Sequence, residues 1–152
     1  MQIPWIVKNS FYEQSYADYL AEIGVSVAWM HYADDALKAI DSQKYPLIIM
    51  NLALATGDCK DDGLARMIAE SADPRNIYRV GLYVLDRIRA PSSPNVDTPV
   101  IVLETVQPHL PLWIDSETPL AICAKRNAQY HCKLNTRGRD LVRIVQEQAK
   151  PL

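Results

Sequence analysis

The chain has 152 residues, 49% of them hydrophobic and 22% charged, which predicts a single domain over residues 1–152 that can bury a core without disulfides or metals. Its net charge of −2 excludes an overall basic surface for nucleic acid, and its apolar runs are too short to cross a membrane. Three cysteines without paired spacing, and an N-terminus without a signal-peptide pattern, favour a cytoplasmic protein with no disulfide, metal or cofactor.

The first third of the chain alternates short apolar runs with segments of helical periodicity. Ser10 and Glu13 have the spacing of a capping box, and Gly24 suits the end of the helix that this box would start. Asp34 can cap a second, shorter helix. In chain order, the expected elements are a strand at 3–7, a helix from 10 to 24, a strand at 25–29, a helix from 34, and a strand at 45–50 that is apolar on both faces.

The rest of the chain continues this alternation after a polar, turn-rich stretch at 55–75. Prolines at 108, 111 and 119 argue against a long helix before about residue 120. Thr136 can cap the last helix. In chain order, the expected elements are helical turns at 64–69, a helix at 76–89, a strand at 99–103, a short helix at 120–127, a strand at 130–134 and a helix after 136.

Alternating strands and helices predict a parallel sheet with helices on both faces, that is, a three-layer α/β fold. Ligands of such sheets usually bind beyond the carboxyl ends of the strands. The polar residues expected at that end are Lys8, Asn9, Asn51, Glu104, Thr105 and Lys133.

Four segments resemble parts of response-regulator receiver domains. Residues 45–54 resemble the third strand of that family, which ends in an Asp followed by Leu. Residues 98–103 resemble its fourth strand, 130–133 its fifth, and 81–89 its third helix. The resemblance implies a CheY-like, flavodoxin-like fold with a five-stranded parallel sheet, and an insertion at about 55–80 after the third strand.

The resemblance also implies a chemistry for each position of the site. In receivers the strand-end Asp accepts a phosphoryl group, two acidic residues after the first strand hold Mg²⁺, and a Thr or Ser and a Lys contact the phosphate. Here Asn51 stands at the phospho-acceptor position, and an amide is not a nucleophile for this reaction. Lys8 and Asn9 replace the acidic pair.

The switch positions are only partly retained. Glu104, followed by Thr105, stands where the family has its hydroxyl, whereas Lys133 matches the conserved lysine and Tyr130 the aromatic residue that changes rotamer on activation. Lys8 brings positive charge to the place of a divalent cation. We therefore expect Lys8 and Glu104 to pair across the end of the sheet.

Several residues allow two interpretations. Asn51 is either a sensor for a small ligand or, as we favour, a structural hydrogen-bonding residue. Lys133 either binds an anion or pairs with a neighbouring carboxylate. Trp113 is either an interface anchor or a core residue. Arg137, Arg139 and Arg143 form either a basic binding patch or, as we favour, a solvated helix face.

No spacing supports a metal site. Asp58, Asp61 and Asp62 do not fit a calcium loop, and a solvated acidic loop is the favoured interpretation. His109, His131, Cys123 and Cys132 are interpreted as buried or edge residues rather than as metal ligands.

These observations predict a non-enzymatic, non-phosphorylatable pseudo-receiver, a signal-transduction module of the two-component type that acts through protein–protein contacts. The resemblance implies a homodimer through the fourth-helix, fifth-strand and fifth-helix face. The alternative is a flavodoxin-like small-ligand-binding protein or enzyme that uses the carboxyl end of the sheet. A nucleic-acid partner is the weakest hypothesis on charge, and no membrane partner is expected.

Overall fold

The computed structural model describes residues 1–70, 73, 76–111 and 117–149, and a five-stranded parallel sheet lies at its centre. The strand order is β2-β1-β3-β4-β5, so the chain changes direction across the sheet between β1 and β3. Such a switch point is where α/β sheets usually bind ligands. The strands are β1 (Gln2–Ile6), β2 (Ser26–Met30), β3 (Ile48–Met50), β4 (Val100–Glu104) and β5 (Gln129–Cys132).

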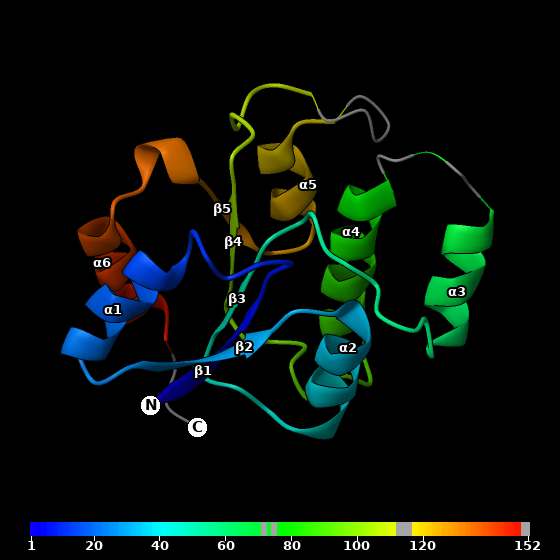
Figure 1. Ribbon diagram of the computed structural model, residues 1–152, viewed down its shortest axis with the longest axis horizontal. Helices are drawn as coiled ribbons and strands as arrows, with labels where there is room; N and C mark the ends of the chain where they lie inside the picture. The colour runs from blue at the N-terminus through cyan, green and yellow to red at the C-terminus, as the bar shows by residue number, and fades with distance from the viewer. Residues whose placement is uncertain (71–72, 74–75, 112–116, 150–152) are drawn as a thin grey trace.

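Helices cover both faces of the sheet and complete the predicted three-layer α/β fold (Figure 1). On one face lie α1 (Gln14–Glu22) and α6 (Gly138–Gln148). On the other lie α2 (Ala33–Ser42), α4 (Asn76–Ile88) and α5 (Pro119–Lys125). A further helix, α3 (Asp62–Ala69), packs against the outer side of α4. No helix in the described ranges is long and apolar enough to span a membrane.

The alternation of side chains along the central strands produces two separate cores. Ile48 and Met50 of β3 point toward α2 and α4, while Ile49 between them points toward α1 and α6. Successive side chains on a strand point to opposite faces. A strand that is buried on both faces is therefore apolar at every position, which is why the central strands were recognisable in the sequence.

Three predicted helix caps are wrong. Glu13, not Ser10, is the residue before α1, and neither side chain caps the helix. Asp34 lies in the first turn of α2 after Tyr32, and its carboxylate accepts a hydrogen bond from the Lys60 N–H at 3.0 Å. The Thr136 hydroxyl donates instead to the Cys132 carbonyl at 2.8 Å.

Helix α3 is attached to the domain through Asp61. The interpretation of Asp61 as part of a solvated acidic loop is therefore wrong. The carboxylate of Asp61 caps α3 by accepting from the Leu64 N–H, and it also accepts from the Tyr83 hydroxyl and the Arg87 guanidinium of α4. Burial favours the neutral acid, but these hydrogen bonds outweigh it and lower the pKa of Asp61 to about 2. Arg87 also pairs with Asp41 of α2 at 2.9 Å.

Asn95 anchors the loop between α4 and β4. Its side chain is fully buried, and its amide oxygen accepts from the Tyr45 N–H and the Thr98 hydroxyl. Its amide nitrogen donates to the carbonyls of Ile40 and Gln43 at the end of α2. One side chain thus joins this loop to α2 and to the chain entering β3.

Candidate functional site

The carboxyl end of the sheet gathers four polar side chains from distant parts of the chain. Asn51 follows β3, Glu104 ends β4, Lys133 follows β5, and Glu13 precedes α1. Asn51, Glu104 and Glu13 are buried, and Lys133 is mostly so. The candidate site is therefore a closed polar cluster within the protein.

Asn51 is held by hydrogen bonds on both sides of its amide. The Trp5 indole N–H donates to Oδ1 at 3.1 Å, and Nδ2 donates to Oε1 of Glu13 at 3.4 Å. Both functions of the amide are thus engaged by side chains of this chain, in agreement with the structural interpretation of Asn51.

Glu13 is the site residue that sequence reasoning missed. It is 2% exposed, and its Oε1 accepts a hydrogen bond from Nζ of Lys133, with which it forms a salt bridge. Its other oxygen, Oε2, is buried without a protein partner in the described structure. The signal in the sequence is an acid shortly after the first strand, although its spacing from Ser10 predicts a capping box instead. Lys133 is therefore paired with a carboxylate, one of the two predicted alternatives.

Glu104 binds backbone N–H groups, and the predicted Lys8–Glu104 pair is wrong. Oε1 of Glu104 accepts from the N–H groups of Leu52 at 3.0 Å and Ala53 at 2.9 Å, and Oε2 accepts from the Thr105 N–H at 3.3 Å. Lys8 itself lies in an exposed turn.

Asn9 lies in the same exposed turn as Lys8, where its side-chain oxygen accepts from the Phe11 N–H at 2.9 Å. The two residues that the sequence predicts in place of the acidic pair of receivers are thus exposed, outside the polar cluster.

Tyr130 is buried beside the cluster, and its hydroxyl donates to the carbonyl of Val106. Burial, together with the nearby negative charge of Glu104, raises the pKa of Tyr130 far above its usual range. The phenol is therefore neutral and can keep donating this hydrogen bond at any physiological pH. Cys132, two residues further along β5, directs its Sγ at the carbonyl of Thr105 at 3.7 Å.

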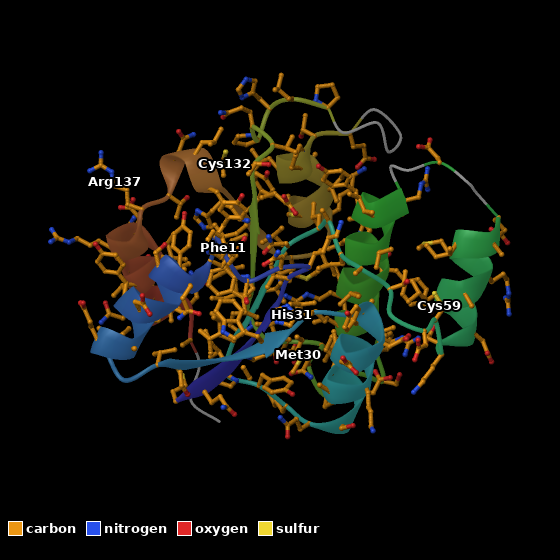
Figure 2. All side chains as sticks on the ribbon, viewed as in Figure 1. Phe11, Met30, His31, Cys59, Cys132 and Arg137 are labelled. Carbon is orange, nitrogen blue, oxygen red and sulfur yellow. The ribbon has the colours of Figure 1, made fainter. Side chains whose placement is uncertain are left out.

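The remaining predicted residues lie apart from this cluster. Arg137, Arg139 and Arg143 are exposed on or next to α6, and Figure 2 shows Arg137 at the outer edge of the molecule. Arg143 pairs with Glu147 on the same helix, as expected of a solvated face. Cys123 and Cys132 are buried and free. Trp113 lies outside the described residues.

A groove of about 890 Å³ lies outside the sheet end. It is open, and it lies between α2 and residues 55–61. Asn51, Glu104 and Lys133 do not line it. Side chains occupy the place where a small-ligand site was the alternative prediction, which disfavours that alternative.

The side chains of the cluster do not suit a divalent cation. Glu13, which accepts from Asn51, already uses the same oxygen to accept from Lys133, and the carboxylate of Glu104 is committed to backbone N–H groups. Mg²⁺ sites usually combine carboxylates with water and phosphate oxygens. Over the described ranges, no three His, Cys, Asp or Glu side chains come close enough together to hold a metal.

The fold closely matches solved receiver domains. A receiver domain of a histidine kinase from Clostridium thermocellum aligns with a TM-score of 0.66 at 16% identity, over 99% of this chain and 98% of that one. The chemotaxis regulator CheY4 of Vibrio cholerae aligns with a TM-score of 0.64 at 13% identity, over 96% of each chain.

The receiver domain of a sensor histidine kinase from Pseudomonas aeruginosa, which has a magnesium ion in its active-site cleft, aligns with a TM-score of 0.62 at 20% identity, over 97% and 95% of the two chains. No family model and no curated protein matches the sequence. The structure therefore has the CheY-like, flavodoxin-like fold of response-regulator receiver domains.

Proposed function

We propose that this chain is a receiver-like signalling module that works without phosphorylation and acts through contacts with partner proteins, not as an enzyme. The observation that carries the proposal is that the chain's own carboxylates occupy the donors of the sheet end. Glu13 binds Lys133, and Glu104 binds the N–H groups that follow Asn51. An incoming phosphoryl group would have to displace both acids and would find an amide where a nucleophile is needed.

The direct test is incubation with acetyl phosphate and Mg²⁺, followed by intact-mass measurement. We expect no gain of a phosphoryl group, while a receiver domain that retains its strand-end Asp gains one under the same conditions. A stable gain of one phosphoryl group that peptide mapping places at the sheet end would refute the proposal.

For the partner surface we propose the face formed by α5, β5 and α6, used for self-association. These elements correspond in order to the fourth helix, fifth strand and fifth helix of a receiver, because α3 adds one helix to the count. β5 is an edge strand whose outer side pairs with no other strand of the sheet, and Leu120 on α5 is 53% exposed. An open strand edge beside an exposed apolar side chain suits pairing with another chain.

Sedimentation velocity tests this surface with a matched pair of variants. Leu120→Asp should lower the dimer fraction, whereas Tyr32→Asp, which changes a similarly exposed side chain after β2 at the opposite edge of the sheet, should leave it unchanged. A specific dimer should form with a Kd below about 100 µM. A wild-type chain that stays monomeric up to that concentration would overturn the self-association proposal and leave the phosphorylation test intact.

A further inference from the structure

Glu104 joins two loops at the end of the sheet. Its carboxylate accepts three backbone hydrogen bonds, two from the segment after β3 (Leu52 and Ala53) and one from Thr105 in the segment after β4. Because the side chain is 5% exposed, water does not compete strongly for these bonds. We call this arrangement, Glu104 with the three N–H groups, the carboxylate bridge.

On one side of the carboxylate bridge, the segment after β3 is fixed against α4. The Leu52 carbonyl accepts from the Gly81 N–H at 3.1 Å, and the Leu54 N–H donates to the Ile77 carbonyl at 3.0 Å. A side chain at Gly81 would begin only 2.2 Å from the Leu52 oxygen, so the backbones approach as closely as glycine allows. The contacts with α4 therefore fix the position of the two N–H groups that bind Glu104.

On the other side, two consecutive carbonyls of the loop after β4 accept hydrogen bonds from side chains of β5. Cys132 reaches the Thr105 carbonyl, and the Tyr130 hydroxyl reaches the Val106 carbonyl. The first two residues of the loop, Thr105 and Val106, are thus held both by Glu104 and by β5. Tyr130 in turn depends on the loop, because Val106 supplies the acceptor that satisfies its buried hydroxyl.

From these contacts we infer that Glu104 takes the place of a transiently bound anion, such as a phosphoryl group, at the N–H groups after β3. Because it is part of the chain, it permanently holds the start of the loop after β4, and Tyr130 with it, in one conformation. The inference deepens the proposed function, on which it rests. The surface next to this loop is then always presented, so that regulation acts on partner binding or on the amount of protein.

Amide hydrogen exchange, followed residue by residue by NMR, tests the reach of the carboxylate bridge. In Glu104→Ala, exchange at Leu52, Ala53 and Thr105, which lose their acceptor, should speed up at least tenfold. Exchange at Leu110, whose N–H donates to the Gln107 carbonyl within the loop, should also speed up, and the Tyr130 ring resonances should shift. Glu104→Gln keeps an oxygen acceptor and should show smaller changes at the same sites, which keeps the test usable where the alanine variant folds poorly. Glu147→Ala, an exposed glutamate of α6, serves as the control and should change none of them.

A double variant decides whether Glu104 and Tyr130 act on the same loop. Tyr130→Phe removes the hydrogen bond to Val106, and combining it with Glu104→Ala should raise loop exchange by less than the product of the two separate increases. Fully multiplicative effects, or faster exchange at Leu52 and Ala53 without any change in the loop, would overturn the inference. The phosphodonor test is independent of these measurements, so the proposed function and the carboxylate bridge can fail separately.

Discussion

Removing the positive partner of Glu13 should destabilise the domain strongly. In Lys133→Met the carboxylate of Glu13 stays buried, with one amide hydrogen bond of 3.4 Å from Asn51 as its remaining partner in the described structure. Leaving a buried charge without its partner costs about 3–5 kcal/mol. Because the Lys133 side chain is 17% exposed, some of that loss is recovered by water, and we expect a loss of about 2–4 kcal/mol.

The double variant Glu13→Met/Lys133→Met should recover most of this loss. It removes both charges and replaces them with apolar side chains of similar length, a change that is often close to neutral for a buried ion pair. Asn51 then lacks an acceptor for its Nδ2, which costs about 1 kcal/mol for a bond this long. We expect the double variant to lie within about 1.5 kcal/mol of the wild type.

Urea unfolding followed by tryptophan fluorescence measures these differences, because Trp5 lies between Asn51 and Trp29 in the same region. Arg143→Met is the matched control: it breaks an exposed pair with Glu147 and should cost less than about 0.5 kcal/mol. The reasoning fails if Lys133→Met costs no more than the control, or if the double variant is as unstable as the single one.

Three further predictions concern the fold. Asp61 has a folded-state pKa of about 2, against 3.8 for the free side chain, so its carboxylate stabilises the fold fully above about pH 4 and not at all as the pH falls toward 2. The difference in free energy of unfolding between wild type and Asp61→Asn should therefore shrink in acid. Gly81→Ala should lower the melting temperature, at a cost of about 1–3 kcal/mol, because the new methyl group overlaps the Leu52 carbonyl; this outweighs the better helix propensity of alanine. A rise in melting temperature would mean that the backbones of α4 and of the segment after β3 lie further apart. Asn95→Ala should cost about 2–4 kcal/mol in urea unfolding, because it leaves several buried backbone groups without partners, and a loss under 1 kcal/mol would show that water replaces the side chain.

Sequence reasoning was most successful where a residue's environment depends on its neighbours along the chain. Helix α4 has the predicted start and ends one residue early, and each predicted strand overlaps the observed one to within about three residues at either end. Helix caps were predicted poorly. The side chains of Asp34 and Thr136 bond to other backbone groups, and a turn at residues 11–13 separates Ser10 from the start of α1.

The sequence by itself determined the layer architecture and the chemical character of Asn51, because apolar periodicity and the identity of a side chain are local properties. Only the tertiary structure decided which charges meet. Glu13 and Lys133 are 120 positions apart, and Glu104 reaches an N–H group 52 positions away. Parallel strands bring such residues to one edge of the sheet, but the choice between Lys8 and a set of backbone N–H groups as the partner of Glu104 depends on how each loop turns there. Burial then selects the arrangement that leaves the fewest charges and donors unpaired.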